Sequence, residues 1–307
     1  MLSTILIPLD GSQFAERAVA YADRLAEATS ARLVLIQVLP LRLLERPETD
    51  LDIADEARAY LRGIADQLTS KGRVVETATP WNDPSSGILD QVRASQAELV
   101  VMATHGRSGP GRWVYGSVAD EVLRAAPVPV VLVPARATRP WAAGARPRIL
   151  VPLDGSELGE AALAPTEKLA TRIGAEVVLL QVVQWPPYTL YGDGAYVMAL
   201  DVDQSLTEAQ QYIGAVAKRL SVSHVRCVVE LGDLPAAIAE IARREKADLI
   251  AMATHGRSGL ARLVLGSVAT GTLQQASIPL MLVRPTELEV ETAPASVEAE
   301  RALQATV

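Results

Sequence analysis

The sequence is poor in the residues that build disulfides, metal sites and nucleic-acid interfaces. Its single cysteine, Cys227, excludes a disulfide within the chain, as suits a reducing compartment. His105 and His255 have no second histidine or cysteine nearby, so the common zinc ligand sets are not expected. The formal net charge of −7 disfavours nonspecific binding to nucleic acid, which depends on neutralising phosphates with a basic surface. We therefore expect no metal site and no nucleic-acid partner.

Long apolar runs are also missing, although 49% of the residues are hydrophobic. No run approaches the roughly 18 residues that a membrane span needs, so no membrane partner is expected. The start, MLSTILIPLDGS, has no basic leader and resembles a first strand more than a signal peptide. These features predict a cytoplasmic protein.

Two smaller features have structural interpretations. Cys227 lies in the alternating run HVRCVVE, which predicts a buried thiol on a strand. Four arginines lie among Pro, Ala and Gly near the middle of the chain, and we interpret them as a solvated linker. They are Arg136, Arg139, Arg146 and Arg148.

One stretch, MATHGRSGPGRWVYGS at Met102 to Ser117, is partly repeated later in the chain. Its first eight residues recur letter for letter from Met252 to Gly259, and its closing Gly-Ser returns as Gly266-Ser267. A loop of small residues with fixed spacing is difficult to explain by core packing alone. The stretch is therefore the candidate functional element.

The rest of the chain alternates short apolar strands with segments of helical periodicity. Strands are expected at about 5–9, 32–39, 73–78, 98–103 and 128–133, with helices at about 15–28, 52–69, 85–95 and 118–125. Ser12 is a candidate N-cap of the first helix. This alternation predicts an α/β fold with a parallel sheet, right-handed crossovers and helices on both faces.

The same pattern then starts again. ILVPLDGS from Ile149 matches ILIPLDGS from Ile5 at seven of eight positions, which indicates two tandem domains. We place them at residues 1–135 and 148–286, with a linker at 136–147 and an acidic tail at 287–307. About six extra residues fall between Trp185 and Asp203, a segment that is either a lid, a partner contact or a plain connection.

The repeated loop has the properties of an anion site. Ligands bind outside the carboxyl ends of strands in open α/β sheets, which is where the loop lies. Gly106 allows close backbone approach, and Gly116-Ser117 opens a helix whose free N–H groups attract phosphate. The loop lacks the Gly-Lys-Ser/Thr of a Walker A sequence; Arg107 and Arg257 are either phosphate contacts or ordinary exposed arginines.

Two further pairs of residues lie near the loop. Asp10 and Asp154 end the first strand of each half and either bind an amine or a ribose hydroxyl, or only shape the Asp-Gly turn. His105 and His255 flank the glycines, but no Ser-His-Asp arrangement accompanies them, so packing is favoured over catalysis. No catalytic residue is predicted.

These residues resemble the universal stress protein family in its tandem form, from residue 1 to about 286. Its ATP-binding members carry Gly-x2-Gly-x9-Gly-Ser/Thr after the fourth strand, matched here by Ala103, Gly106, Gly116 and Ser117 and again by Ala253, Gly256, Gly266 and Ser267. The resemblance implies two doubly wound five-stranded parallel sheets of order 3-2-1-4-5, related to the adenine nucleotide alpha hydrolases. The implied ATP-binding residues are Pro8, Asp10, Val38, Ala103, His105, Gly106, Arg107, Gly116, Ser117 and Val118, with Pro152, Asp154, Val182, Ala253, His255, Gly256, Arg257, Gly266, Ser267 and Val268.

The resemblance also implies an adenine nucleotide as partner, with Mg²⁺ held by the phosphates, and pairing of the two halves through their last strands as a pseudo-dimer, with a homodimer as a further option. The expected role is regulatory or stress-responsive; the alternatives are a slow ATPase and a ligand-free dimerisation scaffold. Ala103 and Ala253 replace the motif's first glycine. Alanine is strained there if the position needs positive φ, and serves equally well if only a small side chain is needed.

Overall fold

The computed structural model describes residues 2–41, 47–105, 115–137, 140–184, 188–190, 196–198, 202–254 and 265–285. Its N-terminal half alternates short strands with helices, as the periodicity predicts. All of these strands but the third are apolar and almost wholly buried. The elements are β1 (Thr4–Pro8), α1 (Gln13–Thr29), β2 (Arg32–Ile36), α2 (Pro47–Ser70), β3 (Val75–Ala78), α3 (Pro84–Ala94), β4 (Leu99–Ala103), α4 (Ser117–Ala125) and β5 (Val130–Val133).

The C-terminal half repeats this order, with a short hairpin, β8 and β9, inserted after its second strand. The elements are β6 (Arg148–Leu153), α5 (Glu157–Glu160), α6 (Leu163–Ile173), β7 (Glu176–Val183), β8 (Tyr188–Leu190), β9 (Tyr196–Met198), α7 (Val202–Arg219), β10 (Val225–Leu231), α8 (Leu234–Arg244), β11 (Leu249–Ala253), α9 (Ser267–Gln275) and β12 (Leu280–Val283). The tail from residue 286 lies outside the described residues.

Ten of these strands form one sheet. Its order is β10-β7-β6-β11-β12-β5-β4-β1-β2-β3, so each half has the expected order 3-2-1-4-5. Neighbours within each half are parallel. The two halves meet where β12 pairs antiparallel with β5, with Met281 opposite Val131.

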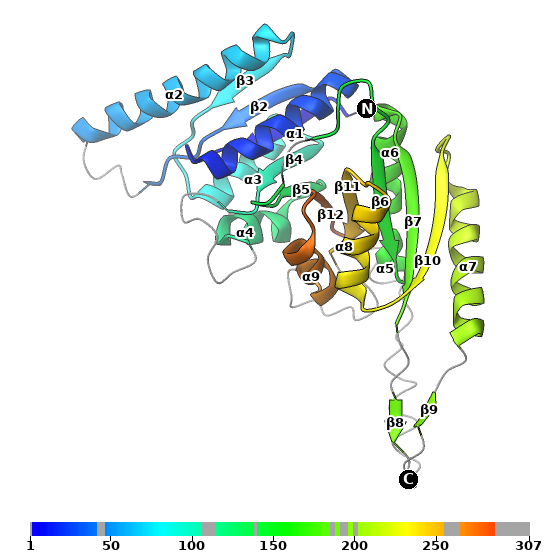
Figure 1. Ribbon diagram of the computed structural model, residues 1–307. Helices are drawn as coiled ribbons and strands as arrows, with labels where there is room; N and C mark the ends of the chain where they lie inside the picture. The colour runs from blue at the N-terminus through cyan, green and yellow to red at the C-terminus, as the bar shows by residue number, and fades with distance from the viewer. Residues whose placement is uncertain are drawn as a thin grey trace.

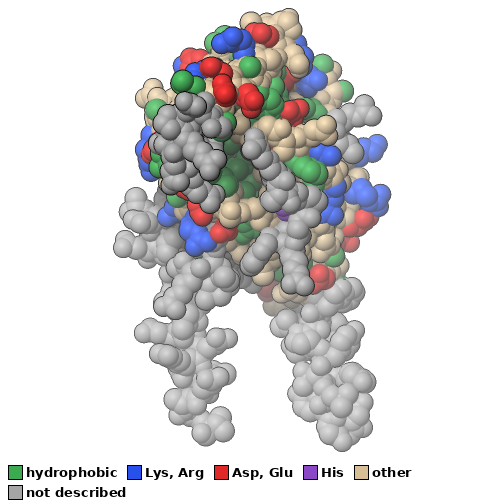
Figure 2. Space-filling view, turned by 90° about the vertical axis from the view of Figure 1, so that its left-hand side faces the viewer, with side chains coloured by type: hydrophobic (Ala, Val, Ile, Leu, Met, Phe, Trp, Pro, Cys, Tyr) green, Lys and Arg blue, Asp and Glu red, His purple; other side chains and the backbone are tan. Residues whose placement is uncertain are grey.

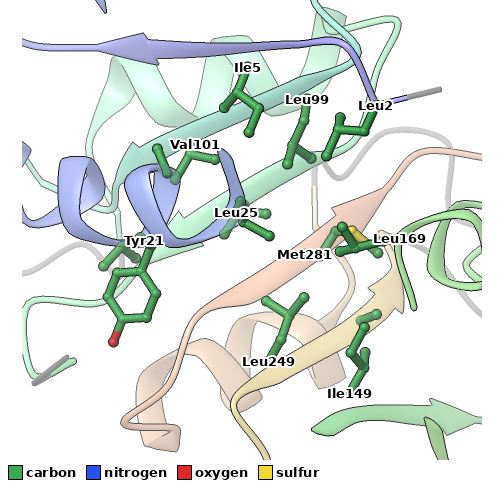
Figure 3. Close-up of a cluster of buried hydrophobic side chains, with 14 of the residues drawn as sticks. Leu2, Ile5, Tyr21, Leu25, Leu99, Val101, Ile149, Leu169, Leu249 and Met281 are labelled. Carbon is green, nitrogen blue, oxygen red and sulfur yellow. The ribbon is translucent and has the colours of Figure 1, made fainter. Parts of the chain in front are cut away.

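Helices cover both faces of the sheet, as Figure 1 shows. One hydrophobic cluster packs α1, α2, α6 and α7 on one face, and a second cluster packs α3, α4, α8 and α9 on the other. Both clusters draw residues from the two halves. Figure 3 shows Ile5 and Leu99 on one side of the shared core and Ile149 and Met281 on the other, so the halves bury apolar surface together.

Local chemistry explains where the first helix of each half begins and why the second copy is broken. Ser12 has extended backbone, and its hydroxyl accepts the N–H of Ala15, so the predicted N-cap is confirmed. Ser156 does the same for Gly159. The second copy is split into α5 and α6, because Pro165 has no N–H to donate to the carbonyl of residue 161.

The prediction of a buried thiol is wrong. Cys227 lies on a strand, β10, but is exposed, because β10 is the outermost strand of the sheet and nothing pairs with its outer side among the described residues. Its Sγ lies 3.7 Å from the carbonyl of Ile213 in α7, and partial burial raises the pKa of the thiol. A raised pKa keeps the thiolate scarce at neutral pH.

The interpretation of the arginines as a solvated linker is wrong for Arg148 but holds for Arg136, which is exposed and lies outside the helices and strands. Arg148 begins β6, and its Nε donates to Glu176 at 2.8 Å. Arg136 donates to the carbonyl of Leu273 in the other half at 3.3 Å. Arg146 is exposed, as predicted, and Arg139 lies outside the described residues.

The described helices include none that is both long and apolar enough to cross a membrane. Much of the segment from Trp185 to Asp203 lies outside the described residues, so its role as lid, contact or connection stays a prediction.

Candidate functional site

A cavity of about 670 Å³ opens at the carboxyl ends of β1, β2 and β4, where the strand order of the N-terminal half reverses. This is the position at which open α/β sheets bind ligands. The hollowed face in Figure 2, with hydrophobic side chains at its bottom, is the side on which the N-terminal half lies. The cavity is lined by eight of the predicted residues: Pro8, Asp10, Val38, Ala103, His105, Gly116, Ser117 and Val118.

Asp10 both shapes the turn after β1 and lines the cavity. Its Oδ1 accepts the backbone N–H of Ser12 at 3.0 Å and the Ser12 hydroxyl at 2.6 Å. Asp10 is also one of the residues that line the cavity. The two interpretations offered by the sequence are therefore compatible, since the turn holds the carboxylate at the edge of the crevice.

Val38 presents its main chain to the crevice. The N–H groups of Gln37 and Leu39 on either side donate to the carbonyls of Ala78 at 3.1 Å and Pro80 at 2.8 Å. Alternate residues of an extended chain turn their backbone groups to opposite sides. The N–H and C=O of Val38 are consequently turned past the end of β1, toward the cavity.

The repeated loop is closed at its base by a backbone hydrogen bond from Gly116 N–H to the carbonyl of Thr104, at 2.8 Å. Gly116 is the N-cap of α4 and supplies no side-chain cap, unlike Ser12 of α1 and Asp83 of α3. The first N–H groups of α4, from Ser117 onward, therefore face the cavity without a capping side chain. Such a helix start attracts anions.

The alanine that replaces the motif's first glycine is unstrained. Ala103 ends β4 and Ala253 ends β11, and neither has a positive φ. Alanine is therefore accommodated at both positions without backbone strain.

Part of the predicted site lies outside the described residues: Gly106 and Arg107 in the first copy, and His255, Gly256 and Arg257 in the second. His105 is described, and its Nδ1 lies 3.0 Å from the hydroxyl of Thr104. In the described part of the chain, no group of three or more His, Cys, Asp or Glu side chains is arranged to hold a metal ion.

The C-terminal half repeats the geometry. Asp154 Oδ1 accepts the N–H and hydroxyl of Ser156 at 3.0 and 2.6 Å, and Gly266 N–H donates to Thr254 at 2.8 Å. Gly266 is again an N-cap without a side-chain cap, here of α9, so Ser267 and Val268 begin a helix as Ser117 and Val118 do. Val182 lies on β7 and Pro152 on β6.

The two halves differ beside these residues. A methyl group at Gly87 in α3 would lie 2.8 and 2.9 Å from the Cγ atoms of Val38, whereas the second half has Ala237 at the corresponding position. Conversely, a methyl group at Gly159 would lie 2.5 Å from Asp154 Oδ1, where the first half has Ala15. The contacts around Val38 and around Asp154 therefore differ from those at the corresponding positions of the other half.

Sequence reasoning missed the apolar walls of the cavity, which come from Leu39, Pro40, Ile53 and Ile88. These residues look like ordinary core positions in the sequence. Gln37 was also missed, although it left a signal, because it is the single polar residue between Leu33 and Leu39.

Comparisons with known proteins agree with this architecture. The sequence matches the universal stress protein family over residues 1–134 and again over 146–284. A universal stress protein of Mycolicibacterium smegmatis is 27% identical over 295 residues, covering 92% of this chain and 97% of that protein. One from Methanocaldococcus jannaschii is 32% identical over 145 residues, covering 46% of this chain and 84% of its own length.

Solved structures show the same fold. A universal stress protein from Archaeoglobus fulgidus superposes with a TM-score of 0.68 at 20% identity, covering 92% of this chain and 99% of that one. A universal stress protein structure from Pseudomonas aeruginosa gives a TM-score of 0.65 at 17% identity, with 94% and 96% covered. With the family matched in both halves, the chain belongs to the universal stress protein family.

Proposed function

We propose that the chain binds ATP, one molecule in each half, and acts as a nucleotide-dependent regulator in a stress response. One observation carries the proposal: Asp10, the main chain of Val38 and the uncapped start of α4 line a single cavity. These groups come from two strand ends and a helix, and together they offer a different contact for each part of a nucleotide.

The chemistry of the cavity suits an adenine nucleotide. The N–H and C=O of Val38 complement the ring nitrogen and the amine on the edge of adenine. Asp10 lines the same cavity, and its carboxylate would accept a hydrogen bond from a ribose hydroxyl. The N–H groups at the start of α4 suit the phosphates, which would hold Mg²⁺.

The size and lining of the cavity support the same ligand. Its volume of about 670 Å³ falls within the roughly 300–1,000 Å³ typical of small-molecule sites. Apolar walls at Leu39 and Ile88 provide a surface for a purine ring. Arg107 and Arg257 are proposed as additional phosphate contacts.

The C-terminal half is proposed to bind a second nucleotide through Asp154, Val182, Gly266, Ser267 and Val268. We take residues 1–135 and 148–286 as the two domains and the antiparallel pairing of β12 with β5 as the contact of an intrachain pseudo-dimer. Measurement of the mass in solution tests whether two chains associate further into a homodimer.

Calorimetric titration with ATP tests the proposal. We expect about two equivalents bound per chain, falling to one in Gly116→Val, because a side chain at the start of α4 excludes the phosphates. Absence of binding by the unmodified protein contradicts the proposal and favours a scaffold role. Steady release of ADP that is lost in the double variant His105→Ala, His255→Ala would instead support a slow ATPase.

A further inference from the structure

A glutamine occupies the same position in both halves, directly before Val38 in the first half and Val182 in the second. Gln37 and Gln181 are related by the offset of 144 residues that also relates Asp10 to Asp154. Leu35 packs on the α1 and α2 face of the sheet, so the next alternate residue, Gln37, points to that face. Leu179 places Gln181 on the matching face of the second half.

Both glutamines carry a buried amide oxygen with no hydrogen-bond partner in the part of the chain that the structure describes. Oε1 of Gln37 and Oε1 of Gln181 are inaccessible to solvent and accept no hydrogen bond from the described residues. Gln37 as a whole is only 8% exposed. An unsatisfied buried acceptor destabilises a fold, and here one occurs at equivalent positions of both halves.

Gln37 also lines the cavity, together with its neighbours Val38 and Leu39. Turning the carboxamide about the Cγ–Cδ bond exchanges the positions of Oε1 and Nε2 and requires no backbone shift. Such a turn replaces an unsatisfied oxygen by one that can accept a hydrogen bond from a ligand.

We propose that Gln37 and Gln181 are specificity-determining residues whose Oε1 atoms accept a hydrogen bond from a donor on the nucleoside part of the ligand. The proposal rests on the proposed nucleotide site. The nucleoside part of ATP carries three donor groups: the adenine amine, the 2′-hydroxyl and the 3′-hydroxyl. Binding one of them at Gln37 selects nucleosides that bear that group.

The first test replaces the amide by an apolar side chain of similar length. The test uses the Gly266→Val variant, in which only the first site is expected to bind ATP. Adding Gln37→Met to this variant is expected to weaken ATP binding roughly tenfold. The same variant without nucleotide is expected to unfold at a higher urea concentration, because it removes an unsatisfied acceptor. A merely structural glutamine would not produce this combination of lower affinity and higher stability.

Matched variants define the controls. Gln67→Met makes the same change at an exposed position of α2 and is expected to alter neither quantity. Gln37→Glu keeps an acceptor at the position and is expected to bind ATP more tightly than Gln37→Met. Equal loss of affinity in Gln37→Glu and Gln37→Met would overturn the role as acceptor.

The ligand side of the test uses purine riboside triphosphate, 2′-deoxy-ATP and 3′-deoxy-ATP, which lack the adenine amine, the 2′-hydroxyl and the 3′-hydroxyl respectively. The analogue that lacks the group bound by Gln37 should bind to Gln37→Met and to the protein with Gln37 with equal affinity. A tenfold penalty that persists for all three, or no penalty with ATP, contradicts the inference while nucleotide binding itself stands. If the unmodified protein binds no nucleotide, the proposed function fails first. Gln181→Met in a Gly116→Val background repeats the test at the second site.

Discussion

Arg284 donates a hydrogen bond from Nη1 to the carbonyl of Arg124, at 2.6 Å, and so joins the end of β12 to the end of α4 in the other half. Arg136 makes the reciprocal contact after β5, to the carbonyl of Leu273 in α9. Both contacts follow from the antiparallel pairing of β5 with β12, which places the exit of each last strand beside the helix that precedes the other. A cation there also complements the negative end of the helix dipole.

We expect the double variant Arg136→Gln, Arg284→Gln to lose about 1 kcal/mol of unfolding free energy, since both contacts between the halves lose a charged donor but the arginines are exposed. Urea unfolding measures the loss. Arg93→Gln, which removes an exposed arginine within α3, serves as the control and should change stability by less than about 0.5 kcal/mol. Equal effects of the two changes would show that the contacts between the halves carry no stability.

A second prediction concerns a buried hydroxyl in α9. Thr272 is fully buried, and its Oγ1 has no hydrogen-bond partner among the described residues. The corresponding residue of the first half, at an offset of 150, is the fully buried Val122. Thr272→Val should therefore stabilise the fold by about 1–2 kcal/mol in urea unfolding, and Val122→Thr should destabilise it. A loss of stability in Thr272→Val would mean that the hydroxyl has a partner.

A third prediction concerns the contact between Gly87 and Val38. Because an added methyl group would lie within 2.9 Å of both Cγ atoms of Val38, Gly87→Ala should cost about 1–3 kcal/mol of stability and displace the valine that faces the cavity. ATP affinity at the first site should fall with it. Gly63→Ala, in α2 with open space around the glycine, is the matched control and should stabilise by about 0.5–1 kcal/mol. Unchanged ATP affinity in Gly87→Ala would place the base away from Val38.

A fourth prediction concerns the pH dependence of stability. Burial alone raises the pKa of Asp23, but hydrogen bonds and charge from Lys71 and Arg73 outweigh it and hold the pKa below 3.8. A lowered pKa in the folded state stabilises the fold above about pH 4, and this contribution disappears as the pH falls through the folded-state pKa. Asp23→Asn should hence destabilise the protein at pH 7 and much less at pH 3, as measured by urea unfolding. Asp66→Asn, at an exposed position, should show no such pH dependence.

Much of the fold follows from the sequence because buried parallel strands are short continuous apolar runs, as in β2 and β7. The position of the repeated loop after β4 also follows from the sequence, because the motif occurs at the end of an apolar strand in both halves. The position of Asp10 follows in the same way from the repeated end of the first strand. Other features depend on distances between side chains that no pattern encodes. The exposure of Cys227 depends on which strand is outermost, and the contact of Gly87 with Val38 on how closely α3 approaches β2. The orientation of the Gln37 amide is likewise a property of the packed fold.

The most direct test of the central claim is to denature the purified protein and quantify the released nucleotide by chromatography, after incubation with ATP and removal of the excess. We predict about two adenine nucleotides per chain, and about one for Gly116→Val and for Gly266→Val. Release of no adenine nucleotide from the unmodified protein, together with no heat on titration with ATP, would contradict the account.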